Sequence, residues 1–399
     1  MKDGKRPQTR IVHAGSHPEK QKGVMNPPVY RASTVIFPTM AALREASKNR
    51  FDTVYYGRLG TPTSFALEEA VADLEGGYRS VTAPSGLAAV TLALMSFLKN
   101  GDHLLMVDNA YDPSRRVCEK FLSDYGIETT FYDPMIGAGI AGLMRDNSKV
   151  VFLESPGSLT FEVQDIPAIA AAARKAGAKV ILDNTWSAGQ FLKPFALGVD
   201  VSVQAATKYI AGHADVMLGL VSAASEADWR LIKTRAAYMG YCAGSDDCYL
   251  ALRGLRTLDV RLQRHQETGL LLAGWFKQRP EVKRVLHPAL PDCPGHEIWK
   301  RDFTGASGLF GVILDAFPKE NVTAMLDGME YFAMGYSWGG FESLILQTDP
   351  KLVRSANEWK EPGLCLRIHA GLEDPDDLIE DLERGFERLT GNLNGGAGS

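Results

Sequence analysis

The stretch VILDNTWSAGQFLKPFALGVDVSVQAATKYIAGHAD, residues 180–215, decides how the rest of the chain is interpreted. It opens with a short apolar run that is typical of a buried parallel strand and ends at Asp183. A second apolar run, residues 201–203, leads into Lys208. Ligands of open α/β sheets bind at the carboxyl ends of the strands. The two runs therefore place one carboxylate and one amine at the same edge of a sheet.

A lysine beside an aspartate at that edge suits the chemistry of pyridoxal phosphate (PLP). The amine can bind the aldehyde of the cofactor, and the carboxylate can keep the pyridine nitrogen protonated so that the ring accepts electrons. For an isolated pair, a surface lysine and an ion pair at a strand end are the alternative. The surrounding motifs have to decide between the two.

Two motifs in this stretch resemble those of the Cys/Met-metabolism PLP-dependent enzymes. SVQAATKYIAGH, residues 202–213, is similar to the lysine motif of that family, and DNTW, residues 183–186, is similar to its aspartate motif. Many relatives have serine where this chain has Ala205 and Ala214, and the first difference removes one hydroxyl that could bind the phosphate. The resemblance extends as far as LRIHAGLED, residues 366–374, and implies that PLP is the cofactor.

The composition is that of an ordinary globular protein. At 399 residues the chain is long enough for two domains, and its net charge of -5 gives no reason to expect nucleic acid. The five cysteines have no metal-binding spacing, so we interpret them as reduced thiols and expect no metal. Because we see neither an apolar leader nor a membrane-length run, we expect a cytoplasmic protein, no membrane contact and a small-molecule partner.

The order of the patterns predicts an α/β fold. A strand at 150–153, a helix after it and the strand before Asp183 imply a right-handed parallel crossover. The resemblance implies fold type I of the PLP enzymes, with a mostly parallel seven-stranded sheet and a smaller α/β domain, and we expect one long helix near residue 255 to link the two. The expected divisions are an N-terminal arm that contacts a neighbouring subunit, a PLP-binding large domain, a C-terminal small domain and a flexible tail, at residues 1–60, 61–255, 256–391 and 392–399.

The phosphate of the cofactor is expected at a helix N-terminus. Ser85 precedes an apolar helix whose first backbone N–H groups, from Gly86 and Leu87, can bind an anion. The resemblance implies a further contact from Thr207. It also implies that Tyr56 and Arg58 bind the phosphate in the active site of the neighbouring subunit, where an arginine and a phenol are apt donors.

The face of the cofactor and the substrate are expected to meet a different set of side chains. Tyr111 follows a strand and lies on the rim that carries Asp183. The resemblance implies that its ring stacks on the pyridine, although a buried packing role is the commoner use of a tyrosine. Arg367 alternates with apolar neighbours along a strand, and the resemblance implies that it holds the α-carboxylate of the substrate.

Three more residues are candidates for substrate binding. Ser337 and Trp338, followed by two glycines, form a tight loop that can cover a ligand. Tyr238 is an accessory candidate, for which a packing role is at least equally well supported.

Within the family, the motifs HPALP, KRDFTGASGLF and YSWGGFESL look like the branch that carries out β-elimination. The implied reaction converts cystathionine to homocysteine, pyruvate and ammonia, with Lys208, Asp183 and Tyr111 as the catalytic residues. An enzyme of γ-elimination or γ-replacement, or a cysteine lyase, would use the same residues and stays open, and a non-catalytic scaffold is a remote alternative. The resemblance also implies a homo-oligomer, a tetramer built from two dimers whose subunits share active sites.

Overall fold

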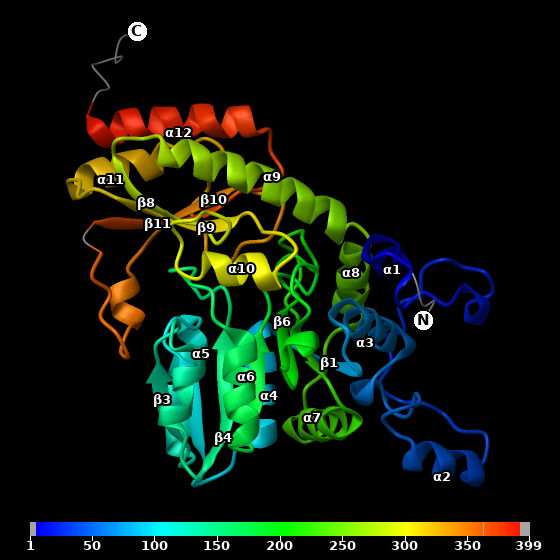
Figure 1. Ribbon diagram of the computed structural model, residues 1–399. Helices are drawn as coiled ribbons and strands as arrows, with labels where there is room; N and C mark the ends of the chain where they lie inside the picture. The colour runs from blue at the N-terminus through cyan, green and yellow to red at the C-terminus, as the bar shows by residue number, and fades with distance from the viewer. Residues whose placement is uncertain (1–4, 362, 392–399) are drawn as a thin grey trace.

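Two β-sheets, one above the other, organise the molecule (Figure 1). The structure, a computed structural model, describes residues 5–361 and 363–391, and the tail expected at 392–399 lies outside them. In the described part of the chain, a seven-stranded sheet is built from residues 79–223 and a four-stranded sheet from residues 282–369. The active site expected from the sequence would draw on both sheets.

The large sheet is mostly parallel, as predicted. Its strand order is β1-β7-β6-β5-β4-β2-β3, and β7 is antiparallel to both of its neighbours. The strands are β1 (Arg79–Ala83), β2 (His103–Val107), β3 (Glu128–Tyr132), β4 (Ser148–Glu154), β5 (Lys179–Asp183), β6 (Val201–Ala205) and β7 (Gly219–Ala223). The parallel strands β2, β4, β5 and β6 therefore end at one edge. In the register of β4 and β5, Glu154 lies beside Asp183 at that edge.

Helices cover the large sheet, and their ends follow local capping signals. These helices are α3 (Pro62–Glu75), α4 (Gly86–Phe97), α5 (Asp112–Arg116), α6 (Ile166–Lys175) and α7 (Glu226–Met239). The hydroxyl of Ser85 accepts a hydrogen bond from the Ala88 N–H at 3.1 Å, which fixes the start of α4. Gly76 ends α3 in the left-handed conformation at φ 79°. The start of α4 that was predicted after Ser85 is thus confirmed.

The small sheet is antiparallel, in the order β10-β11-β9-β8. Its strands are β8 (Val282–Leu286), β9 (Leu309–Leu314), β10 (Leu344–Thr348) and β11 (Leu364–His369), and its helices are α9 (Leu258–Lys277), α10 (His296–Asp302), α11 (Lys319–Asp327) and α12 (Pro375–Thr390). Leu366 and Ile368 of β11 are buried in a core with side chains of α9, α11 and α12. Alternate residues of β11 therefore face the large domain, where Arg367 was expected.

One expectation for the helices was wrong, and the N-terminal arm holds helices that were not predicted. The N-terminal segment contains α1 (Pro7–His13) and α2 (Met40–Lys48), and the Thr39 hydroxyl caps α2 by accepting from the Ala42 N–H at 3.1 Å. The single long helix expected near residue 255 is instead α8 (Ser245–Leu255) followed by α9. Gly254 packs at this junction against the backbone, because a Cβ there would come within 2.4 Å of the carbonyl oxygens of Ile210 and Ala211.

Short helical turns complete the described elements: η1 (Pro18–Lys20), η2 (Gly57–Leu59), η3 (Val117–Leu122), η4 (Gly137–Leu143), η5 (Pro194–Leu197) and η6 (Pro350–Val353). All five cysteines are unpaired, and all but Cys242 are buried. None of the helices in residues 5–361 and 363–391 combines the length and the apolar character that crossing a bilayer requires.

Candidate active site

The lysine and the aspartate of the opening stretch lie at the carboxyl edge of the large sheet. Asp183 is the last residue of β5, and Lys208 lies in the turn that follows the neighbouring strand β6. The Lys208 N–H donates to the Ala205 carbonyl at 3.0 Å, and the Gly212 N–H donates to the Lys208 carbonyl at 2.8 Å. The backbone of the lysine is therefore fixed on both sides.

The amine of Lys208 points toward the small domain. It donates a hydrogen bond to the Ser337 hydroxyl at 2.7 Å and lies 5.1 Å from the centre of the Trp338 ring. Burial and the charge of Arg367 together lower the pKa of Lys208 to about 8, although the charge of Asp183 opposes them. An amine with this pKa is partly unprotonated near neutral pH, which a nucleophile or a base requires.

Asp183 is held by neutral donors. Its Oδ1 accepts hydrogen bonds from the Thr185 N–H at 3.0 Å and the Thr185 hydroxyl at 2.5 Å. Burial raises the pKa of Asp183, whereas the Thr185 hydrogen bonds and the charge of Lys208 oppose the rise. A cation bound against this carboxylate, such as a protonated pyridine nitrogen, would stabilise its charged form.

The structure adds one carboxylate that the sequence interpretation missed. Glu154, the last residue of β4, accepts a hydrogen bond from the Tyr111 N–H at 2.7 Å. Burial raises the pKa of Glu154 well above its usual range, and the charge of Asp183 raises it further. The signal was in the sequence, because Glu154 is the first polar residue after the apolar run 150–153. Tyr111 itself is 49% exposed, so it is not the buried packing residue of the alternative interpretation.

The N-terminus of α4 and the end of β6 touch at the expected phosphate site. A Cβ on Gly86 would lie 2.6 Å from the Cβ of Ala205, so position 86 has no room for a side chain without a shift. The first N–H groups of α4, which include Gly86 and Leu87, have no partner within the helix and can bind an anion. The hydroxyl of Thr207 accepts from the Leu218 N–H at 3.0 Å, so a phosphate contact from Thr207 stays a prediction.

Arg367 enters the site from β11 of the small domain. Its Nη2 donates to the carbonyl oxygens of Gly335 and Ser337, each at 3.1 Å, and burial lowers its pKa. Ser337 has a φ of 77°, an uncommon conformation for a residue with a side chain. The loop that carries Ser337 and Trp338 thus touches both Lys208 and Arg367, so three of the four predicted substrate-binding residues lie together.

Three predicted residues lie elsewhere. The Arg58 Nη1 donates to the carbonyl of Ala237 at 2.6 Å, next to Tyr238 at the end of α7. Tyr238 is 74% exposed and Tyr56 is 43% exposed. Among the described residues, no hydrogen bond or ion pair joins these three side chains to the group around Lys208. Their roles in binding the phosphate and the substrate stay predictions.

The residues present fit PLP. A partly neutral amine, a half-buried carboxylate with neutral donors and a helix N-terminus without room for a side chain lie around one edge of the sheet. These features match the aldehyde, the pyridine nitrogen and the phosphate of the cofactor. Among the described residues, no group of three or more His, Cys, Asp or Glu side chains could hold a metal ion.

This fold and this site define a PLP-dependent enzyme of fold type I. The family described as "Cys/Met metabolism PLP-dependent enzyme" matches residues 8–387, and the chain belongs to it. A relative named cystathionine β-lyase MetC, from Escherichia coli K12, is 45% identical over 388 residues, which cover 96% of this chain and 98% of that protein.

Other relatives carry different names. An L-alanine/L-glutamate racemase of Wolbachia pipientis is 41% identical over 391 residues, covering 95% of this chain and 96% of that protein. Among solved structures, a cystathionine γ-synthase from Xanthomonas oryzae superposes with a TM-score of 0.89 at 30% identity, and the match covers 98% of this chain and all of that chain. The fold is thus shared by enzymes that are named for different reactions.

Proposed function

We propose that this protein catalyses the β-elimination of L-cystathionine, which yields L-homocysteine, pyruvate and ammonia, in methionine biosynthesis. The observation that carries the proposal is the 45% identity to a cystathionine β-lyase over nearly the whole length of both chains. The site supports it, because it brings together a partly neutral amine, a carboxylate-binding arginine and a hydroxyl that bonds to the amine.

Each group has a role in the proposed reaction. Arg367 binds the α-carboxylate of the substrate, because its planar guanidinium can pair with both carboxylate oxygens. Lys208 in its neutral form removes the Cα proton and then protonates the sulfur that leaves Cβ. Asp183 keeps a proton on the pyridine nitrogen. The bound PLP ring supplies an acceptor for the electron pair left at Cα.

The remaining residues hold the reacting groups in position. The hydroxyl of Ser337 orients the Lys208 amine, with which it makes a hydrogen bond of 2.7 Å. Gly86, Leu87 and Thr207 are proposed to bind the phosphate, and Trp338 covers the amine. Once the carbon–sulfur bond is broken, the released enamine takes up water and gives pyruvate and ammonia.

The products test the proposal. Purified protein with PLP and L-cystathionine should form pyruvate and homocysteine, identified by mass spectrometry, and Lys208→Ala should form neither. If 2-oxobutyrate and cysteine appear instead, the reaction is γ-elimination and the proposal is wrong. A colourless protein that takes up no PLP and turns over none of the sulfur amino acids would revive the scaffold alternative.

Racemisation is a second candidate, which the relative from Wolbachia pipientis favours. It also begins with removal of the Cα proton, but it needs a proton donor on the opposite face of the substrate. Burial raises the pKa of the Tyr111 phenol, and so does the charge of Glu154, which keeps the phenol protonated as such a donor requires. Incubation with L-alanine in D₂O would separate the two reactions. A racemase forms deuterated D-alanine, whereas an enzyme that carries out only β-elimination of cystathionine forms no D-alanine.

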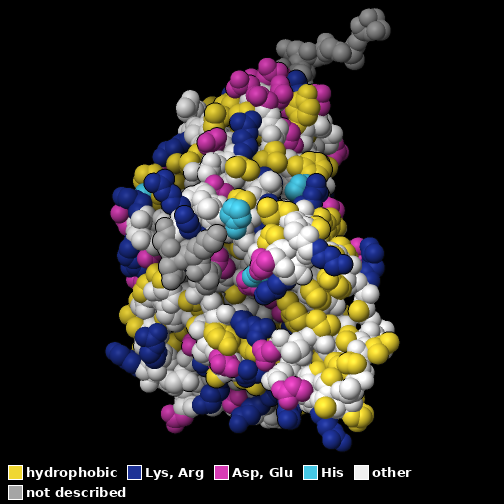
Figure 2. Space-filling view, turned by 90° about the vertical axis from the view of Figure 1, so that its right-hand side faces the viewer, with side chains coloured by type: hydrophobic (Ala, Val, Ile, Leu, Met, Phe, Trp, Pro, Cys, Tyr) yellow, Lys and Arg dark blue, Asp and Glu magenta, His cyan; other side chains and the backbone are white. Residues whose placement is uncertain are grey.

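We also propose that the protein is at least a dimer, and a tetramer built from such dimers. Tyr56, Arg58 and Tyr238 lie away from the group around Lys208 and are free to complete the site of a neighbour. Figure 2 shows hydrophobic side chains gathered on the face that carries the N-terminal arm, and Ile36 and Met40 of the arm are exposed by 88% and 62%. A cytoplasmic location is proposed because the cysteines are unpaired.

A further inference from the structure

A polar segment of the small domain leaves its own sheet and contacts the large domain beside the active site. This segment, residues 349–361, follows β10 on the way to β11 and includes η6. Figure 1 shows it as the orange stretch that descends from the small sheet toward α5. We call it the strap.

The first anchor of the strap is Asp108, the residue that follows β2. Its buried carboxylate accepts hydrogen bonds from the N–H groups of Ser355, at 2.9 and 3.0 Å, and of Ala356, at 2.8 Å. Arg115 forms an ion pair with the same carboxylate at 2.8 Å. Burial alone raises the pKa of Asp108. The hydrogen bonds from Ser355, Ala356 and Arg115 outweigh this effect and lower the pKa. The strap is therefore attached through its backbone to a charged group of the large domain.

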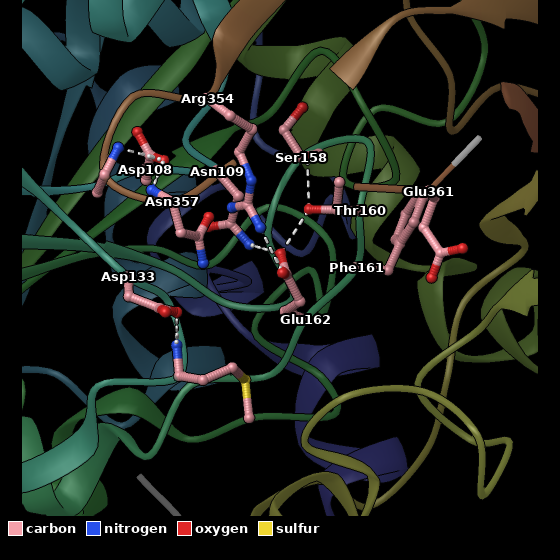
Figure 3. A network of polar contacts seen from close by, with 12 residues as sticks. Asp108, Asn109, Asp133, Ser158, Thr160, Phe161, Glu162, Arg354, Asn357 and Glu361 are labelled. Atoms are coloured by element: carbon pink, nitrogen blue, oxygen red, sulfur yellow. Dashed lines mark hydrogen bonds and ion pairs between the residues drawn. The ribbon is translucent and has the colours of Figure 1, made fainter. Parts of the chain in front are cut away.

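The second anchor is a buried ion pair between Arg354 of the strap and Glu162 (Figure 3). The exposed fractions of the two side chains are 3% and 9%. The other oxygen of Glu162 accepts from the Thr160 hydroxyl at 2.6 Å and from the Asn109 amide at 2.9 Å. Glu162 thus links the strap to the residue that follows Asp108.

This second anchor is a poor source of stability. The Nε and Nη1 of Arg354 and the Oδ1 of Asn357 are buried without a partner among the described residues. An incompletely satisfied buried ion pair contributes little to folding, and apolar side chains often pack at least as well. We therefore interpret the ion pair of Arg354 and Glu162 as fixing the position of the strap rather than as stabilising the fold.

The geometry that it fixes lies in the active site. Asp108 and Asn109 lead directly into Tyr111, whose own N–H is bound by Glu154 at 2.7 Å. At its other end the strap continues into β11, the strand that carries Arg367. Tyr111 and Arg367 are near enough for the charge of each to alter the pKa of the other. The strap therefore connects the segment that carries Tyr111 to the strand that carries Arg367.

We propose that the strap is a positioning device that sets Tyr111 relative to Arg367, and that Arg354 and Asp108 are positioning residues for substrate binding. The inference rests on the proposed function in taking Arg367 as a substrate contact, and it further takes the Tyr111 hydroxyl as one. It applies to any amino acid that the site accepts, because every such substrate carries the carboxylate that Arg367 binds.

A double-mutant cycle of Arg354→Gln and Tyr111→Phe tests the inference. In the otherwise unchanged holoenzyme, Arg354→Gln should lower kcat/KM about tenfold, mainly through KM, because a misplaced contact weakens binding. In the Tyr111→Phe background, the same change should cost less than about twofold. Arg354→Lys should restore part of the loss, and the absorbance of bound PLP should stay unchanged in every variant.

Glu361→Gln provides the matched control. Glu361 belongs to the same strap, but its ion pair, to Arg284 at 2.8 Å, ties the strap to β8 of the small domain. This variant should leave kcat/KM unchanged. If Arg354→Gln fails to fold, Thr160→Val replaces it, because this change removes one hydrogen bond to Glu162 and leaves the ion pair intact.

The affinity for L-alanine, titrated through the absorbance of bound PLP, serves as a second readout in all four proteins of the cycle. Additive effects of the two changes on both readouts would overturn the inference, even where the wild type forms pyruvate as proposed. Failure of the wild type to form pyruvate would refute the proposed function alone, because the cycle can still be completed with L-alanine.

Discussion

At the scale of single residues, Arg367 gives the sharpest test of substrate binding. Arg367→Lys keeps the charge but loses the planar pair of donors, so kcat/KM should fall about 10- to 100-fold, mainly through KM. Arg388→Lys is a matched control, because Arg388 also donates to backbone carbonyl groups, at 3.0 and 3.3 Å, but does so on α12 away from the site. An unchanged KM in Arg367→Lys would contradict the assigned role.

Lys208 predicts a pH dependence of stability in protein from which PLP has been removed. The pKa of the folded state, about 8, lies below the usual value of 10.5. Below pH 8 the folded state therefore bears the full cost of burying the charge. Between about pH 8 and 10.5 the unfolded state binds more protons, so stability rises with pH.

Lys208→Met should remove this dependence. We expect the variant to be more stable than the wild type by about 2 kcal/mol at pH 7, with the difference shrinking as the pH approaches 10.5. Urea denaturation of both apoproteins between pH 7 and 10.5 would measure it. Lys99→Met, at an exposed position, should show a small difference that does not change with pH.

Single residues were predictable where a motif and a strand end coincided. Asp183 and Lys208 lie at the expected places, because a short apolar strand allows only a few residues at its end, and Arg367 does so because of the alternation along β11. Glu154 follows the same rule and was missed because it belongs to no motif that was considered. The resemblance assigned Tyr56 and Arg58 to the site of the neighbouring subunit, whereas no pattern indicated which subunit Tyr238 would serve.

At the scale of elements, the loop that carries Ser337 is held against the lysine by a glycine. Gly339 has a φ of 87°, and a Cβ there would lie 2.8 Å from the Tyr209 nitrogen and 3.0 Å from the Lys208 carbonyl carbon. Gly339→Ala should therefore displace the loop and lose about 1–3 kcal/mol of stability together with most activity.

Gly274→Ala is the matched control for this prediction. Gly274 lies in α9 with open space around its absent Cβ, so alanine there should raise stability by about 0.5–1 kcal/mol. Thermal denaturation and kcat/KM of both variants give the comparison. Full activity in Gly339→Ala would mean that the loop does not have to lie against Lys208.

Elements were predictable where their signals are local. The cap Ser85 and the alternation along β11 both have the predicted outcome. The strap could not be predicted, because its sequence has no periodicity and its anchors are residues about 250 and 190 positions away, such as Asp108 and Glu162. The break between α8 and α9 depends on a tertiary contact of Gly254 and was missed for the same reason.

At the scale of the whole molecule, sharing of sites between subunits can be tested by complementation. Arg58→Ala and Lys208→Ala should each be inactive or nearly so. When the two are co-expressed, a hybrid dimer has one intact site, so the mixture should recover about a quarter of wild-type activity. The activity of the purified mixture measures this recovery.

A pair that cannot complement serves as the control. Lys208→Ala co-expressed with Asp183→Asn should recover nothing, because both residues belong to one chain's site, and each half of the hybrid is therefore defective. Recovery in this control, or none with Arg58→Ala, would contradict shared active sites.

The overall architecture was predictable because alternating strands and helices allow few arrangements. Association between subunits was not predictable in the same way, because it depends on exposed surface residues such as Ile36 that carry no periodic pattern.

The division of the site between two sheets sets an order of events during synthesis. Ribosomes release the chain from its N-terminus, so the residues from Gly86 to Lys208 emerge well before Arg367. We expect vitamin B6 to be captured by a chain that still lacks its amino acid pocket, which postpones turnover until translation ends. Ribosome-bound chains of increasing length test this order. The fluorescence of bound vitamin B6 should appear at a shorter chain length than the response to L-alanine, and appearance of both at the same length would refute the expected order.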